Sequence, residues 1–150
     1  MITSFHTDQE FPFKHKLNCK VPNLIYKIDD LQCKKTSIGS TTEITKRWRN
    51  HKSHIRKGVK SCEIASHFSS VHSLDKQGTI DVYDDQLKKI LRVTLIDYVD
   101  MEGVKCNEAK TRLLKEREEL WQHQLKSFEI HGGFNKCGAR KEASARSYTS

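Results

Sequence analysis

The chain has 150 residues, which is enough for one compact domain with a modest core and short tails. Apolar residues make up 35% of it and charged residues 31%, and no run of 18 apolar residues occurs, so a membrane-spanning helix is excluded. The net charge of +8 is uneven, because residues 43–60 carry seven Lys/Arg and one Glu, whereas residues 75–102 carry seven Asp/Glu and four Lys/Arg. A basic block within a folded segment favours nucleic acid as partner, and a solvated helix face is the alternative.

The N-terminal segment lacks the basic start and apolar stretch of a secretion signal. We therefore expect an intracellular protein whose five cysteines are reduced thiols. We expect an irregular lead-in over residues 1–22, which contains both prolines, one domain over residues 23–136, and a disordered basic tail over residues 137–150.

Two strands are expected at the start of the domain. Residues 23–29 are rich in strand formers, and their apolar side chains alternate onto one face: Leu24, Tyr26 and Ile28. Residues 34–39 form the second candidate strand. The four or five residues between the two segments predict a hairpin.

A basic helix follows the hairpin. Ser40 and Glu43 fit a capping box at its start, with Ser40 as the N-cap, and we expect the helix to end near Lys57. Four residues recur at helical spacing on one face of it: Ile44, Trp48, His51 and Ile55.

Three further elements complete the domain. We expect a helix over residues 62–72, a strand over residues 89–99, and a long helix over residues 108–126 with Asn107 as its N-cap. The order β-β-α-α-β-α predicts an α+β domain in which a small three-stranded antiparallel sheet is flanked by helices.

The last helix carries a carboxylate on its apolar side. Leu114, Trp121, Leu125 and Phe128 form one stripe, and Glu118 lies about 40° from Leu114 around the helix axis. A carboxylate in that position needs a metal ion, an arginine or hydrogen-bond donors as its partner. The alternative is a glutamate at the edge of the stripe that reaches water or pairs with a basic residue.

Five short segments, taken in order, resemble the GIY-YIG nuclease family: LIY, SIG, KRWRNH, EREELW and GGFN. Leu24-Ile25-Tyr26 looks like the first signature, with leucine in place of its glycine. Ser37-Ile38-Gly39 looks like the second signature, with Ser37 in place of its tyrosine. Ten residues separate Tyr26 from Ser37, which is a spacing typical of the family.

This resemblance implies a set of site residues and a reaction. Tyr26 falls on the first signature tyrosine, Arg47 on the catalytic arginine, His51 on an associated histidine, Glu118 on the metal-binding glutamate and Asn135 on the asparagine that closes the site. The implied reaction is hydrolysis of a DNA strand with one Mg²⁺ or Mn²⁺ ion held by Glu118. The implied partner is DNA, and neither a small-molecule cofactor nor binding to a membrane is expected. The implied location, from this substrate class, is the nucleus. The basic helix would supply the contacts to DNA: Lys46, Arg49, Lys52, Arg56 and Lys57.

Ser37 separates two hypotheses of function. A serine hydroxyl is shorter and far less acidic than a phenol, so it cannot replace a tyrosine in proton transfer. If the signature tyrosine takes part in proton transfer, its absence would lower the rate by about 10²–10⁴. The first hypothesis is a metal-dependent DNA endonuclease weakened by this change. The alternative is a catalytically inactive nucleic-acid-binding domain that keeps the GIY-YIG fold. A third interpretation, an interaction module without nucleic acid, requires the basic helix to be incidental.

A narrower resemblance concerns zinc. The segments before and after the two signatures are similar to the GIY-YIG domains of Penelope-like retroelements, which place a CxxC pair between the signatures and a histidine pair later. Asp30 and Cys33 occupy the first pair of positions here, and His67 and His72 supply the second. The resemblance implies a zinc site at these four residues, and histidines on a helix surface are the alternative.

Overall fold

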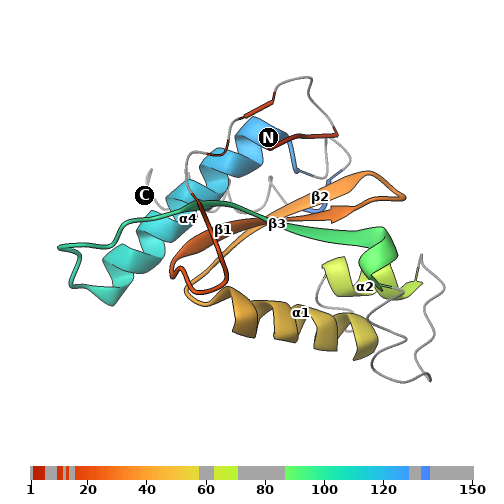
Figure 1. Ribbon diagram of the computed structural model, residues 1–150, viewed down its shortest axis with the longest axis horizontal. Helices are drawn as coiled ribbons and strands as arrows, with labels where there is room; N and C mark the ends of the chain where they lie inside the picture. Colours follow the sequence, from red (N-terminus) through yellow and green to blue (C-terminus); the bar gives the residue numbers. More distant parts are fainter. Residues whose placement is uncertain are drawn as a thin grey trace, which may run out of the picture.

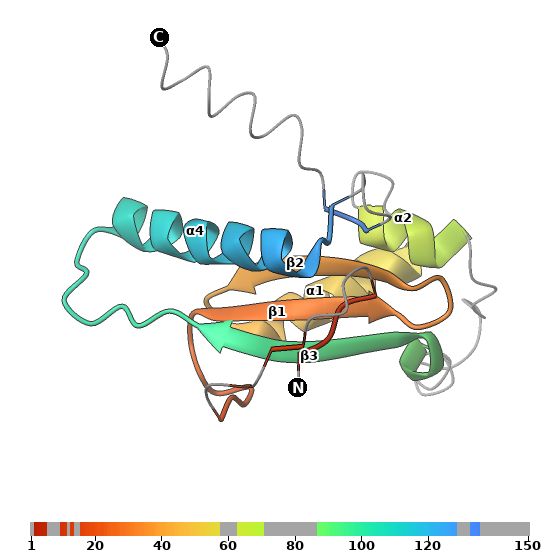
Figure 2. The ribbon, with the colours of Figure 1, turned by 90° about the horizontal axis from the view of Figure 1, so that it is seen from above.

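The computed structural model describes residues 2–5, 10–11, 13, 16–57, 63–70, 87–128 and 133–135. In this part of the chain, a three-stranded antiparallel sheet carries helices on both faces (Figures 1 and 2). The elements in chain order are β1 (Leu24–Asp30), β2 (Lys35–Thr41), α1 (Ile44–Lys57), α2 (Glu63–Ser70), β3 (Leu91–Tyr98) and α4 (Asn107–Leu125). The predicted α+β fold and its element order are confirmed.

The strands are arranged in the order β2-β1-β3, so β1 is the central strand and is buried along its whole length. The predicted hairpin joins β1 to β2. In its turn, one carboxylate oxygen of Asp30 accepts the backbone N–H groups of Gln32 and Cys33 at 3.0 and 2.9 Å. Lys34 completes the turn with a φ of 55°, in the left-handed region. Tyr26 pairs with Gly39 across the two strands, and Ile28 pairs with Ser37.

Each face of the sheet has its own apolar core, because successive side chains of a strand point to opposite faces. The predicted face of Leu24, Tyr26 and Ile28 packs against α1 and α2. The opposite face, which includes Ile25 and Ile38, packs against the apolar stripe of α4: Leu114, Trp121 and Leu125. Figure 1 shows the resulting layers, with α4 on one side of the sheet and α1 and α2 on the other.

Three predicted boundaries were wrong. Ser40 does not cap α1, because β2 continues to Thr41 through pairing with β1 and the helix begins at Ile44. The backbone N–H of Glu43 instead donates to Thr41 Oγ1 at 3.1 Å. Asn107 is the first residue of α4 and not its N-cap; Cys106 holds that position without a side-chain hydrogen bond.

The predicted strand start at residue 89 is the third error. Residues 87–90 form a helical turn, and β3 begins at Leu91. The apolar residues of this turn, Leu87 and Ile90, are buried in the same core as α1 and α2, which explains why the run looked like a continuation of the strand. None of the described helices combines the length and the apolar character that crossing a membrane requires.

Candidate active site

A cleft of about 380 Å³ opens where the edge strand β2 meets the start of α1 and the middle of α4. Residues from four elements line it. They include Tyr26 from β1, Gly39, Ser40 and Thr41 from β2, Arg47 from α1, and Lys115 and Glu118 from α4. Tyr26, Arg47 and Glu118, three of the predicted site residues, therefore face one cavity although they come from three different elements.

Gly39 allows the ring of Tyr26 to reach this cleft. The two residues are direct cross-strand partners. A Cβ atom built on Gly39 would lie 2.5 Å from both Cζ and the phenol oxygen of Tyr26, far inside van der Waals contact. The ring is 96% buried, so it has little room to move aside. The absence of a side chain at position 39 is therefore a steric requirement of the position of the Tyr26 ring.

The phenol of Tyr26 is paired with His51. Tyr26 Oη lies 2.9 Å from His51 Nε2, and the two rings meet edge to face with centroids 5.8 Å apart. Burial of the imidazole lowers the pKa of His51 to about 4, and the positive charges of Arg47 and His54 contribute. His51 is therefore neutral at physiological pH, and one of its ring nitrogens is a proton acceptor. His51 lies behind Tyr26 and not in the lining of the cleft.

Arg47 supplies a positive charge at the cleft. Its side chain is exposed, and within the described residues its guanidinium has no hydrogen-bond or ion-pair partner. A guanidinium carries five N–H donors arranged to bind two oxygens of a phosphate at once. The cleft therefore offers an uncommitted cation beside the Tyr26–His51 pair.

Glu118 is 8% exposed and holds its carboxylate at the wall of the cleft. Ser40 Oγ donates to Oε2 at 2.9 Å, and Gln122 Nε2 donates to Oε1 at 3.3 Å. Lys115 Nζ lies 3.7 Å from Oε2, a salt bridge of the kind expected for a glutamate at the edge of the stripe. Each carboxylate oxygen has one close donor, which fixes the orientation of the group and leaves lone pairs for another ligand.

Ser40 and Gln122 are site residues that the sequence did not predict. Ser40 lies 78 residues from Glu118 along the chain, and its local sequence fits a helix cap. Gln122 is four residues after Glu118, so the two share one face of α4. That spacing could have identified Gln122, whereas no local signal points to Ser40.

Asn135 is placed beside the cleft and not in its lining. Its side-chain carbonyl accepts the backbone N–H of Ile38 at 2.8 Å, and its amide donates to the carbonyl of Ile38 at 3.1 Å. Phe134 N–H also donates to the Thr36 carbonyl at 3.0 Å. These contacts cover the free edge of β2 up to Ile38, so Asn135 fixes the strand immediately before Gly39.

Two solved structures share this arrangement of elements. One is the catalytic domain of the homing endonuclease I-TevI, with 22% sequence identity and a TM-score of 0.51 over 77% of this chain and 98% of that one. The other is a glutamate-to-alanine mutant of the catalytic domain of the intron endonuclease I-TevI, with 21% identity and a TM-score of 0.51 over 78% and 95% of the two chains. The chain has the GIY-YIG nuclease fold. No protein-family model and no curated protein matches it.

On this GIY-YIG fold, α1 presents the predicted basic residues next to the cleft. Lys46, Arg49 and Lys57 are exposed, and Lys52 and Arg56 are half-buried. Lys52 lies over the ring of Trp48, with its ammonium 6.0 Å from the ring centroid. The helix that supplies Arg47 is therefore also the most basic element of the fold.

A second cluster on the GIY-YIG fold joins three of the four predicted zinc residues. The ligand atoms of Asp30, Cys33 and His67 all lie within 4.8 Å of one another. His67 Nε2 is 2.6 Å from Asp30 Oδ2, and the pKa of the Cys33 thiol is raised by desolvation and by its hydrogen bond to Asp30. His72 lies outside the described residues. The hairpin turn and α2 thus bring together side chains that are 37 residues apart.

Proposed function

We propose that this protein is a DNA endonuclease that hydrolyses phosphodiester bonds in the cleft between β2, α1 and α4. One observation carries the proposal: the phenol of Tyr26, the guanidinium of Arg47 and the buried carboxylate of Glu118 face the same cavity from three elements, with His51 hydrogen-bonded to the phenol from behind. Phosphoryl transfer needs these three kinds of group, for proton transfer, for stabilising the phosphate charge and for holding a metal ion.

The residues at Glu118 fit a single divalent cation. Mg²⁺ and Mn²⁺ are typically held by one or two carboxylates together with water and substrate phosphate, in a site that is open to solvent. Glu118 supplies one oriented carboxylate, and the cleft is wide enough for water and a phosphate. A metal ion bound there would neutralise charge on the phosphate and on the leaving oxygen. The ammonium of Lys115, at 3.7 Å from the carboxylate, would compete only weakly with the metal ion for Glu118.

Tyr26, His51 and Arg47 would supply proton transfer and charge stabilisation. Because His51 is neutral above pH 4, one of its ring nitrogens can accept a hydrogen bond from the phenol of Tyr26, which raises the electron density on the phenol oxygen and orients its lone pairs towards a proton of the attacking water. Arg47 would hold the non-bridging oxygens of the phosphate and stabilise the charge that develops on them.

DNA is the proposed substrate because of the charge of α1. The basic residues Lys46, Arg49, Lys52, Arg56 and Lys57 belong to the same helix as Arg47, so contacts from them to flanking phosphates would direct one phosphodiester towards the cleft. A nuclear location is part of this proposal, since it rests on DNA as the substrate.

Nicking of supercoiled plasmid tests the proposal. The wild-type chain is incubated with Mg²⁺ or Mn²⁺ beside Glu118→Ala and a matched control, Glu116→Ala, which removes an exposed carboxylate of the same helix. We expect nicking by the wild type and by Glu116→Ala, and a nicking rate at least about 100-fold lower in Glu118→Ala. Equal nicking by all three proteins would contradict the assignment of Glu118 and of the cleft.

Ser37 favours a second candidate function, a catalytically inactive domain that binds nucleic acid. Ser37 lies on the same face of the sheet as Tyr26, two residues before Gly39, where the GIY-YIG signature has its second tyrosine. The same experiment separates the candidates. DNA binding without nicking in the wild type, over a range of metal concentrations, would support the inactive domain.

We also propose that Asp30, Cys33 and His67 bind zinc, with His72 as the fourth ligand. Zinc is bound by such oxygen, sulfur and nitrogen ligands, and the close approach of the three ligand atoms supports the assignment. The proposal would relate the chain to the GIY-YIG domains of Penelope-like retroelements. Substitution of Co²⁺ should give a thiolate charge-transfer band in the wild type that is absent in Cys33→Ser. A band of equal strength in both proteins would contradict Cys33 as a ligand.

A further inference from the structure

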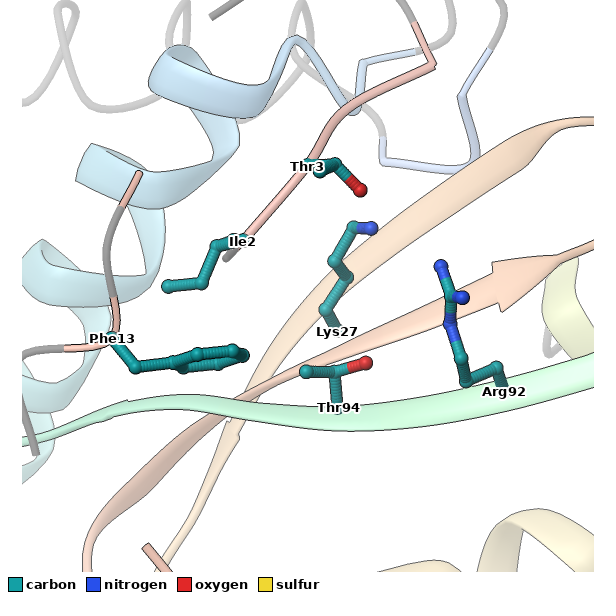
Figure 3. A pocket seen from close by; sticks show the side chains of 6 residues that line it. All are labelled: Ile2, Thr3, Phe13, Lys27, Arg92 and Thr94. Atoms are coloured by element: carbon teal, nitrogen blue, oxygen red, sulfur yellow. The ribbon is translucent and has the colours of Figure 1, made fainter. Parts of the chain in front are cut away.

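A second pocket, separate from the candidate active site, lies on the face of the sheet that carries α4 (Figure 3). Its volume is about 220 Å³, and Ile2, Thr3, Phe13, Lys27, Arg92 and Thr94 line it. Lys27 directly follows Tyr26 on β1, so the two side chains point to opposite faces of the sheet. The pocket and the cleft therefore share no lining residue.

Two cations from neighbouring strands point into this pocket, and one carboxylate is shared between them. Lys27 Nζ donates to Asp29 Oδ2 at 2.8 Å, and an Arg92 guanidinium nitrogen donates to the same oxygen at 3.2 Å. The other oxygen of Asp29 accepts Thr36 Oγ1 at 2.7 Å. Asp29 is fully buried and Lys27 is 3% exposed.

The cluster of Lys27, Arg92 and Asp29 thus carries one positive charge in excess. An ammonium has three donors and a guanidinium five, and Asp29 uses one of each. Asp29 compensates the buried ammonium of Lys27, whereas the guanidinium of Arg92 is about half exposed and keeps its charge accessible to a ligand. The pocket is consequently suited to an anionic group that accepts several hydrogen bonds at once, as a phosphate does.

The opposite end of the pocket is apolar and aromatic. Figure 3 shows Phe13 and Ile2 at one end, Arg92 at the other, and Lys27 and Thr94 between them. Phe13 is 46% exposed. Among the described residues, three large apolar side chains are exposed, and Phe13 is aromatic whereas Leu31 and Leu120 are aliphatic. An exposed ring beside a cationic site is the arrangement on which proteins stack nucleobases.

We propose that this pocket binds one nucleotide, with its phosphate on Lys27 and Arg92 and its base against Phe13. The hydroxyls of Thr3 and Thr94 would hydrogen-bond the polar edge of the base or the sugar. Pockets that enclose a whole drug-sized ligand have volumes of about 300 Å³ or more. This pocket is smaller, so the sugar of the nucleotide would stay open to solvent. The site can therefore hold a free nucleotide or one residue of a single strand, and neither depends on nuclease activity.

Binding is measured by calorimetry on the full chain, without divalent metal, using four probes: deoxyadenosine monophosphate, deoxyadenosine, inorganic phosphate and a hexamer of deoxyadenosine. Arg92→Gln is the main variant, because Arg92 is about half exposed and Lys27 still pairs with Asp29 when it is replaced. Phe13→Ala removes the aromatic surface. Arg112→Gln removes an exposed guanidinium of α4 that lines neither pocket, and it is the matched control for loss of a cation.

We expect the monophosphate to bind, Arg92→Gln and Phe13→Ala each to weaken its binding about tenfold, and Arg112→Gln to leave its affinity unchanged. A hexamer that binds at least about tenfold more tightly than the monophosphate, and that loses this extra affinity in Arg92→Gln, would identify a single strand as the ligand of this pocket, and equal affinity would identify the free nucleotide. No binding of the monophosphate or the hexamer would overturn the proposal. The proposal would also be overturned if phosphate or deoxyadenosine alone bound as tightly as the monophosphate, or if Arg112→Gln lost as much affinity as Arg92→Gln.

Discussion

The ring of Tyr26 crosses the backbone of Gly39 so closely that the two residues depend on each other. A Cβ at position 39 would lie 2.5 Å from the phenol oxygen, which is itself 2.9 Å from His51. Gly39→Ala should therefore displace the ring and separate the phenol from His51. We expect plasmid nicking to fall at least about tenfold while the far-ultraviolet circular dichroism stays unchanged.

A double-mutant cycle identifies the route of this effect. If Gly39 acts through the hydroxyl of Tyr26, the variant Tyr26→Phe combined with Gly39→Ala should nick no more slowly than Tyr26→Phe alone. Losses that multiply would instead indicate that Gly39→Ala disturbs the cleft independently of the phenol.

The low pKa of His51 predicts how stability depends on pH. In the unfolded chain the imidazole has a pKa near 6.5, whereas in the folded chain it is about 4. Between these values the unfolded state binds more protons, so the contribution of His51 to folding is complete above about pH 6.5 and falls as the pH drops towards 4. The loss is at most about 3 kcal/mol.

His51→Gln removes this titration and keeps a hydrogen-bonding group next to Tyr26. Urea unfolding of both proteins at several pH values between 4 and 7 should show the wild type losing more stability than the variant as the pH falls. Parallel curves would mean that His51 binds protons as readily in the folded protein as in the unfolded chain, which would contradict its low pKa.

Ser40 holds the carboxylate of Glu118 from the opposite side of the cleft. Loss of its hydroxyl leaves Oε2 with the ammonium of Lys115, at 3.7 Å, as its charged partner. Ser40→Ala should raise the metal concentration needed for half-maximal nicking about tenfold, since a less restrained carboxylate binds the cation less well. Ser53→Ala, on α1 and outside the cleft, is the control. An unchanged metal requirement in Ser40→Ala would contradict the role assigned to this hydrogen bond.

The layers of the fold could be predicted because periodicity determines them. Alternation on β1 identified the face of Tyr26, and the spacing of apolar residues on α4 identified Glu118 as a carboxylate turned towards the sheet. Both are local patterns that the packing of a sheet between helices preserves.

The partners of these side chains could not be predicted in the same way. Ser40 fits a helix cap locally, but pairing of Thr41 with Leu24 extends β2 and turns Ser40 towards α4. Asn135 reaches the backbone of Ile38, 97 residues earlier. Such contacts depend on where the chain returns in space, and short-range sequence patterns do not encode that. The pocket at Lys27 and Arg92 went unpredicted for the same reason.

The basic helix α1 predicts how DNA binding depends on salt. Each phosphate contact that is lost should reduce the slope of log affinity against log salt concentration by about one. We therefore expect Arg47→Ala and Lys52→Ala each to weaken binding of a short duplex and to flatten its salt dependence, measured by fluorescence anisotropy. Lys105→Ala, which removes an exposed charge from the loop before α4, should leave the slope unchanged. An unaltered slope in the two α1 variants would exclude this face of α1 as the DNA contact.

Ser37→Tyr tests whether the altered second signature limits the reaction. Position 37 is 7% exposed and lies opposite Ile28 on the face of Tyr26, two residues before Gly39, so the substitution adds a ring on the side of the sheet that carries the Tyr26 phenol. If the missing phenol limits proton transfer, the substitution should raise nicking by about 10²–10⁴, and Ser37→Phe, which adds the ring without the hydroxyl, should not. Thermal unfolding of both variants separates this effect from overpacking, which costs typically about 1–3 kcal/mol. Equal rates for the tyrosine and phenylalanine variants, in folded proteins, would show that the hydroxyl at this position is not what the site lacks.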